Sequence, residues 1–192
     1  MTGQMETYPD EIVGERIVLK ILDATPENAK AVSCLVKKNA EYLRSYFSSE
    51  VAYSENVQMT LKLLHRMHKL RQENDTLLYH IFHQEKMVGS VEILIYPHER
   101  ELRYWLDNEA KGKGLMYESV CLVEQMLFER KHDIIILSIS DKNTPSLKLA
   151  KRLGYIPDAM DCYEITYNRY NRLRGSNKNV NISDIVNRKM QR

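Results

Sequence analysis

Apolar positions recur along the chain with two periods, and the period predicts the type of each element. Between residues 57 and 70, apolar side chains recur every three or four positions, as in an amphipathic helix. Shorter runs rich in β-branched and aliphatic residues, bounded by turn-forming residues, are typical of strands. The pattern predicts helices over residues 23–39, 40–47, 57–70, 114–130 and 143–154, and strands over residues 15–22, 76–82, 86–96, 101–107, 133–140 and 163–170.

The order of these elements predicts the fold class. The three strands between residues 76 and 107 are joined by short polar segments, which favours an antiparallel meander. The strand over 133–140 is apolar on both alternating faces, as in a parallel strand that is covered on both sides. The sequence therefore predicts an α+β (mixed α/β) fold, with one domain over residues 1–167 and a basic extension over residues 168–192.

Composition excludes several classes of protein. Hydrophobic residues make up 43% and charged residues 28% of the 192 residues, as in soluble globular domains. The longest aliphatic run, Ile134–Leu137, is far shorter than the roughly 18 apolar residues of a membrane span, so no membrane partner is expected. The first residues lack a secretory signal. Cys34, Cys121 and Cys162 lack zinc-site spacing and predict reduced thiols in a cytoplasmic protein.

Charge is uneven at the C-terminus. The net charge of +2 is too small to imply a polyanionic partner. Residues 168–192 carry seven basic side chains and one acid, Asp184, which predicts either a solvated tail or a contact surface for RNA or a ribosome. Tyr170 is the one aromatic residue of this segment, so a nucleic-acid partner is not expected.

A glycine turn, "KGKGLM" (Lys111–Met116), lies where a predicted strand meets a predicted helix. Glycine lets the backbone approach a ligand closely, and the first amides of a helix can bind phosphate oxygens. The turn is not a P-loop, because Gly114 follows Lys113 where Ser or Thr is required. It is not a dinucleotide fingerprint, because Tyr117 replaces the third glycine. A phosphate cradle of another kind and an ordinary turn both remain open.

Two ordered segments resemble the GNAT superfamily of N-acetyltransferases. "LRYWLDNEAKGKGLMYESV" (Leu102–Val120) is similar to its strand and acetyl-CoA turn, and "DKNTPSLKLAKRLGY" (Asp141–Tyr155) to its second cofactor segment. "LVKKNAEYLRSYF" and "GERIVLKIL" resemble a substrate-side helix and the first strand. Within the superfamily the chain looks closest to the ribosomal-protein acetyltransferases that modify an N-terminal alanine or serine. The resemblance implies a twisted, mostly antiparallel sheet whose splayed central strands hold acetyl-CoA, with flanking helices. Homodimers are frequent among these relatives.

The resemblance also implies site residues. The backbone amides of Gly112, Lys113, Gly114, Leu115 and Met116 would hold the pyrophosphate, and Lys111 takes the place of the usual Gln or Arg. Asn143 and Ser146 would contact the cofactor near its pantetheine arm and thioester.

Two departures from the family pattern bear on the chemistry and the acceptor. Ala150 stands where the superfamily often has a tyrosine, which excludes a tyrosine general acid at that position. Tyr46, Phe47 and Ser48 occupy the region of the subgroup's Trp-Leu-Pro-Trp segment, which bears on the acceptor.

Acetyl transfer to an amine needs a neutral amine, a polarised carbonyl and a proton for the leaving thiolate. An α-amine with pKa ~7.8 costs about 1 kcal/mol to deprotonate at pH 7, against about 4.6 kcal/mol for a lysine. The candidate base is Glu92, a carboxylate inside an apolar strand, and Glu101 is the second candidate; an exposed structural role for Glu92 is the alternative. Ser146 would protonate the sulfur, or only cap a helix. A backbone N–H near Leu94–Tyr96 or near Trp105 would hold the thioester oxygen.

Three functions fit these features. The first is acetyl-CoA-dependent N-acetylation of a primary amine, in particular of a protein or peptide N-terminus such as that of a ribosomal protein. The second keeps the fold but acetylates a small amine such as an antibiotic or polyamine, and the third is a non-catalytic CoA-binding domain. No metal is expected, because His65 and His68, one turn apart, lack a third ligand. Tyr42 and Tyr46 share one helix face, either for packing or as part of an acceptor pocket.

Overall fold

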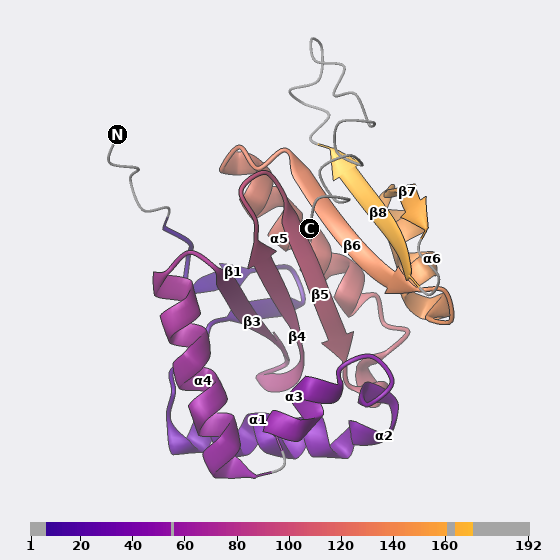
Figure 1. The fold of residues 1–192 in the computed structure, drawn as a ribbon. Helices are drawn as coiled ribbons and strands as arrows, with labels where there is room; N and C mark the ends of the chain where they lie inside the picture. The colour runs from indigo at the N-terminus through magenta and orange to yellow at the C-terminus, as the bar shows by residue number, and fades with distance from the viewer. Residues whose placement is uncertain (1–6, 55, 161–163, 171–192) are drawn as a thin grey trace.

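The computed structural model of the chain describes residues 7–54, 56–160 and 164–170. In these residues eight strands form one sheet in the order β1-β2-β3-β4-β5-β6-β8-β7 (Figure 1). Neighbouring strands are antiparallel except β5 and β6, which are parallel. The strands are β1 (Glu11–Val13), β2 (Ile17–Lys20), β3 (Thr76–His83), β4 (Lys86–Ile95), β5 (Arg100–Leu106), β6 (Ile134–Ser140), β7 (Ile156–Met160) and β8 (Glu164–Tyr170). The expected mixed, mostly antiparallel sheet is confirmed.

Helices flank this sheet. Figure 1 shows α5 passing behind it, α1 to α3 grouped at the end where β5 stops, and α4 running along the side of β1 and β3. The helices are α1 (Pro26–Lys38), α2 (Ala40–Leu43), α3 (Ser48–Tyr53), α4 (Val57–Gln72), α5 (Leu115–Glu129) and α6 (Thr144–Leu153), and a 3₁₀ turn η1 covers Asn108–Ala110. The main core lies between the sheet, α5 and α6. Trp105 belongs to a second core beneath α1 to α3, as expected for a core side chain. No helix in the described ranges is long and apolar enough to span a bilayer.

Helix ends follow local sequence signals. The Thr25 hydroxyl accepts a hydrogen bond from the Asn28 N–H at 3.2 Å and caps α1, which Pro26 begins. The Asn143 side chain caps α6 in the same way, and Gly154 ends that helix in the left-handed conformation at φ 82°. These predicted caps are confirmed.

The structure also contains elements that the sequence pattern did not predict, namely β1, α3 and β7. All three are short, and β7 contains Pro157, which cannot donate to a ladder and is tolerated here because β7 is the edge strand. The helix predicted over 40–47 ends at Leu43. Strand β8 extends to Tyr170, past the expected boundary at residue 167, and residues 171–192 lie outside the described residues, so the basic extension stays a prediction.

Strands β5 and β6 separate after a short contact. They pair only at Arg100 with Ile135 and at Glu101 with Ile136. Beyond these pairs β5 continues to Leu106 beside β4, while β6 continues to Ser140 beside β8. The sheet therefore opens between two neighbouring parallel strands, as expected, and the opening lies near the C-terminal ends of both.

Candidate active site

At the opening between β5 and β6, a cleft of about 620 Å³ lies between the end of β5 and the starts of α5 and α6. One wall is the glycine turn and the start of α5, with Gly112, Gly114 and Met116; the opposite wall is the start of α6, with Asn143 and Ser146. The structure thus brings together most of the residues predicted to hold the cofactor, although more than 25 positions separate the two segments in the chain.

The edge of β5 that faces the cleft carries unpaired backbone groups. The Asp107 N–H donates to the Val88 carbonyl of β4 at 2.6 Å, so by strand alternation the N–H groups of Tyr104 and Leu106 point away from β4 into the cleft. The expectation of an oxygen-binding N–H near Leu94–Tyr96 is wrong. Strand β4 is paired on both edges, the Ile95 N–H donates to Asp75, and the Tyr96 N–H donates to Glu99. The backbone N–H groups of Tyr104 and Leu106, which flank Trp105, are therefore the ones available to bind a thioester oxygen.

The glycine turn has the backbone of a phosphate cradle. Gly112 and Gly114 have φ values of 76° and 77°, in the left-handed region that favours glycine. A Cβ added to Gly112 would meet no protein atom within 4 Å, so the backbone there is open to a ligand. Gly114 precedes α5 and supplies no side chain to cap it, which leaves the first amides of α5 available for an anion.

Arg16 braces this turn and was missed from the sequence. Its guanidinium donates to the Lys113 carbonyl at 2.8 Å and pairs with Glu118 of α5 at 2.8 Å. Arg152 of α6, also missed, lines the cleft with its guanidinium 4.3 Å from the centre of the Tyr117 ring. No sequence signal marks either arginine, because each acts on residues far away in the chain.

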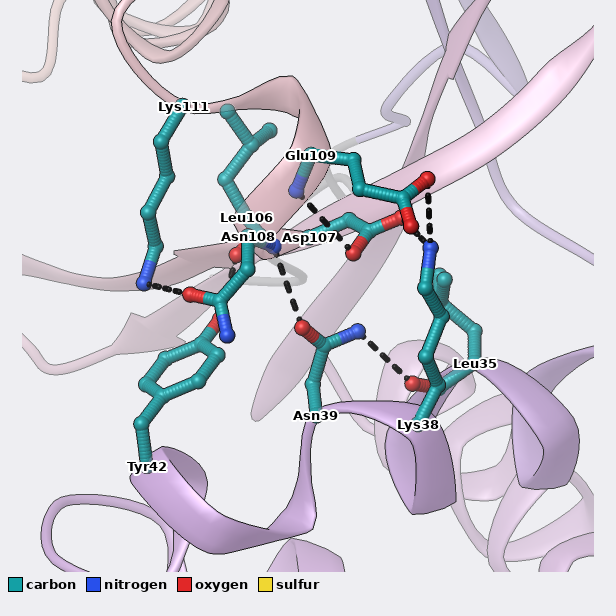
Figure 2. A network of polar contacts seen from close by, with 9 residues as sticks. All are labelled: Leu35, Lys38, Asn39, Tyr42, Leu106, Asp107, Asn108, Glu109 and Lys111. Carbon is teal, nitrogen blue, oxygen red and sulfur yellow. Dashed lines mark hydrogen bonds and ion pairs between the residues drawn. The ribbon is translucent and has the colours of Figure 1, made fainter.

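Lys111 is turned toward a polar network rather than left to bind an anion (Figure 2). Its ammonium donates to Asn108 Oδ1 at 2.5 Å and lies 3.4 Å from the centre of the Tyr42 ring. Burial lowers the pKa of Lys111, partly offset by Asp107. The Tyr42 hydroxyl donates to the Leu106 carbonyl, which is on the cleft side of β5. Tyr42 therefore fixes the end of β5, while Tyr46 lines the cleft.

The same network ties the corner between α1 and α2 to the approach to the glycine turn (Figure 2). Lys38 contacts Asp107 and Glu109, each at 2.8 Å, and Asn39 Oδ1 accepts from the Asn108 N–H at 3.0 Å. Burial alone would raise the pKa of Asp107, but hydrogen bonds from Lys38 and Asn39 outweigh it and the pKa is lowered. The cleft is thus anchored to the α1–α2 corner by charge-assisted hydrogen bonds.

Asn143 and Ser146 reach the cleft together because one caps the other. Asn143 Oδ1 accepts from the Ser146 N–H at 3.3 Å, which places both at the N-terminus of α6. Asn143 and Ser146 line the cleft and also a neighbouring cavity of about 500 Å³. This geometry allows Ser146 to meet a thioester in the cleft.

The two candidate bases occupy different places. Glu101 lies in the cavity of about 500 Å³ with Ser146; its carboxylate is 3.7 Å from the Arg103 guanidinium and 3.5 Å from the Tyr96 hydroxyl. Glu92 lines a third cavity of about 570 Å³ with Arg103, but without Ser146. Strand pairing places both carboxylates on one face of the sheet, and Phe47 lines all three cavities.

Histidines give no metal site in the described part of the chain, where no group of three possible ligands occurs. His68 contacts the Leu22 carbonyl at 2.9 Å.

Comparison with known proteins adds independent findings. Residues 18–156 match the family model described as "Acetyltransferase (GNAT) domain". RimL, a ribosomal L7/L12 α-N-protein acetyltransferase, aligns with a TM-score of 0.73 and 22% identity over 84% of this chain and 94% of its own. The ribosomal-protein-S5-alanine acetyltransferase from Vibrio fischeri aligns with a TM-score of 0.73 and 17% identity over 84% and 97%.

A third structure, the microcin C7 self-immunity acetyltransferase MccE in complex with acetyl-CoA and AMP, aligns with a TM-score of 0.72 and 17% identity over 82% and 94%. The comparison with curated proteins finds no match. Ribosomal-protein acetyltransferases, the subgroup that the sequence resembles, are thus among the similar solved structures, and the predicted cosubstrate agrees with what MccE binds. Since the family model covers most of the chain, the protein belongs to the GNAT family of acetyltransferases.

Proposed function

We propose that this protein transfers an acetyl group from acetyl-CoA to the α-amino group of a protein or peptide N-terminus. The observation that carries the proposal is the cleft at the opening between β5 and β6, which runs from the glycine turn to Ser146. It shares Ser146 with the cavity of about 500 Å³ between β5 and β6, and shares Phe47 and Trp105 with the cavity of about 570 Å³ over β4 and β5. A cofactor and an amine can therefore approach the same point from different directions.

The residues fit acetyl-CoA. The backbone amides from Gly112 to Met116 would hold the pyrophosphate, since Gly112 is open and the start of α5 has no side-chain cap. The cleft-facing N–H groups of Tyr104 and Leu106 would bind the pantetheine arm and the thioester oxygen. When bound, acetyl-CoA supplies an activated carbonyl and a thiolate leaving group.

The chain supplies the proton transfers. Glu92 or Glu101, directly or through a water, would accept the proton that the attacking amine loses. Ser146 would donate its hydroxyl proton to the sulfur as the C–S bond breaks. An α-amine needs only a weak base, because its deprotonation at pH 7 costs about 1 kcal/mol.

The acceptor class rests on the similar structures. RimL is named as a ribosomal L7/L12 α-N-protein acetyltransferase and the Vibrio fischeri enzyme as a ribosomal-protein-S5-alanine acetyltransferase, and we propose a ribosomal-protein N-terminus as the acceptor. We further propose that the enzyme acts in the cytoplasm and as a homodimer. MccE is named for self-immunity to microcin C7, so small amines are the alternative to test. Tyr46, Phe47 and Ser48, which replace the subgroup's aromatic motif, line the cavity of about 500 Å³ and would contact the acceptor.

Calorimetric titration with acetyl-CoA, followed by thiol release over a panel of acceptors, tests the proposal. The panel contains three kinds of acceptor: peptides that begin with a free Ser or Ala, peptides whose N-terminus is blocked and whose one free amine is an internal lysine, and polyamines. Turnover with free N-termini alone supports it; binding without turnover on any acceptor, or turnover on polyamines alone, contradicts it.

Variants test the roles within the same assay. Ser146→Ala should lower kcat and leave acetyl-CoA binding intact, with Ser138→Ala, an exposed serine of the same cavity, as its control. Glu92→Gln and Glu101→Gln compare the two candidate bases, and the true base is the one whose loss lowers kcat most at low pH.

A further inference from the structure

Tyr104 carries a buried hydroxyl that no structural role explains. Its ring packs against the main core from β5. Its oxygen is buried and makes no hydrogen bond of normal geometry to any described residue. Buried hydroxyls are nearly always satisfied, and a phenylalanine would fill the same space without this penalty. Such a group is expected where function requires it.

Ser146 is the polar side chain that faces this hydroxyl across the cleft. Tyr104 and Ser146 line both the cofactor cleft and the cavity of about 500 Å³. Burial raises the pKa of Tyr104 to about 12, partly offset by the approach of Ser146. The phenol is therefore protonated at neutral pH and has one proton to donate.

Two other buried polar side chains of this region, Glu124 and Tyr155, face each other. Glu124 Oε2 pairs with Arg169 of β8 at 3.3 Å. Tyr155 faces Glu124, and the neighbouring carboxylate raises the pKa of that phenol beyond the increase from burial. Of these three groups, Ser146 is the one that lines the cleft together with Tyr104.

We propose that Tyr104 is a positioning residue for Ser146, donating its O–H to Ser146 Oγ so that the serine O–H points into the cleft. This inference rests on the proposed function, in which Ser146 protonates the leaving sulfur. In that step the Ser146 O–H bond breaks and an S–H bond forms, and the hydrogen bond from Tyr104 stabilises the charge left on Oγ. The serine then recovers a proton from solvent, to which Glu92 or Glu101 releases the proton lost by the amine.

The variant Tyr104→Phe separates this role from a structural one. It keeps the ring, which carries the packing against the main core, and removes only the hydroxyl, so Tm should stay nearly equal. We expect kcat to fall about tenfold, as for the loss of one hydrogen bond of about 1.4 kcal/mol, with an unchanged KM for acetyl-CoA. Tyr155→Phe removes another buried hydroxyl of this region and should leave kcat unchanged.

The double variant Tyr104→Phe/Ser146→Ala shows whether Tyr104 acts through the serine. We expect it to turn over no slower than Ser146→Ala alone. Three results would each overturn the assignment. In the first, Tyr104→Phe lowers kcat by the same factor in the Ser146→Ala background as in wild type. In the second, the kcat of Tyr104→Phe stays within twofold of wild type, and in the third, Tyr104→Phe lowers Tm and raises KM together.

These outcomes differ from a failure of the proposed function. If the wild-type protein acetylates no N-terminal amine, the proposed function fails. If Ser146→Ala lowers kcat but Tyr104→Phe does not, only the assignment of Tyr104 fails.

Discussion

The buried side chain of Glu124 makes the free energy of unfolding depend on pH near neutrality. Its side chain on α5 is 4% exposed and is 3.3 Å from Arg169. Burial raises the pKa of Glu124 from 4.5 to about 7, against the attraction of Arg169 and a hydrogen bond from Tyr155. Burial, together with the Glu124 carboxylate, raises the pKa of Cys121 one turn earlier. The charged form of Glu124 is therefore disfavoured in the folded state.

The sign and size of the effect follow from linkage. Because the folded pKa lies above the unfolded value, the folded state binds more protons between the two, and stability falls as pH rises from about 4.5 to above 7. The full difference corresponds to about 3 kcal/mol, of which about 2.5 kcal/mol is lost between pH 5 and pH 8. Glu124→Gln is neutral at every pH and removes this loss. Arg169 then loses its partner, but it is 31% exposed and stays hydrated.

Urea unfolding followed by circular dichroism at pH 5, 6, 7 and 8 measures the effect. The Glu124→Gln variant should be more stable than wild type by about 2–3 kcal/mol at pH 8 and by less than about 1 kcal/mol at pH 5. Glu129→Gln, on the same helix and exposed, is the matched control and should follow the wild-type curve. If the curves of wild type and Glu124→Gln run parallel over this range, the assigned burial effect is wrong.

Three further substitutions test the site and its scaffold. Gly112→Val should weaken acetyl-CoA binding in calorimetry at least tenfold, because a β-branched residue strains the backbone at φ 76° and its side chain projects into the proposed phosphate site. The protein should stay folded, since the added Cβ meets no protein atom; unchanged affinity would refute the cradle. Tyr42→Phe removes the hydrogen bond to the Leu106 carbonyl and should raise KM for acetyl-CoA a few-fold. Tm should change little, because the aromatic ring beneath Lys111 remains; a lower Tm with an unchanged KM would show a purely structural role. Gly89→Ala should destabilise the protein by several kcal/mol in urea unfolding, because its Cβ would lie 2.2 Å from the Trp105 carbonyl; near wild-type stability would contradict the packing of β4 on β5.

Features set by neighbouring residues could be predicted from the sequence. The Thr25 and Asn143 caps, the Gly154 terminus and the buried strand β6 depend on side chains within a few positions of one another. The opening of the sheet was expected from the resemblance to the GNAT superfamily, which the two cofactor segments carry. Strand β7 was missed because Pro157 argues against a strand unless its position at the edge is known.

Features set by the arrangement of distant strands could not be predicted. Which N–H groups face the cleft depends on which edge of β5 lacks a partner, so the expectation of a group near Leu94–Tyr96 was wrong. The alternative near Trp105 agrees with the structure, but only the folded chain shows that the groups are those of Tyr104 and Leu106. Arg16 contacts the glycine turn from 97 positions away. The roles of Glu92, Glu101 and Ser146 stay predictions.

The central claim is acetyl transfer to an N-terminal amine in the cleft between β5 and β6. Its most direct test is mass spectrometry of one peptide that carries a free N-terminal serine and an internal lysine, after incubation with acetyl-CoA and the protein. The account predicts one acetyl group on the α-amine, released CoA in equal amount, and loss of both with Gly112→Val. Acetylation of the lysine alone, or no acetyl transfer despite bound acetyl-CoA, would contradict it.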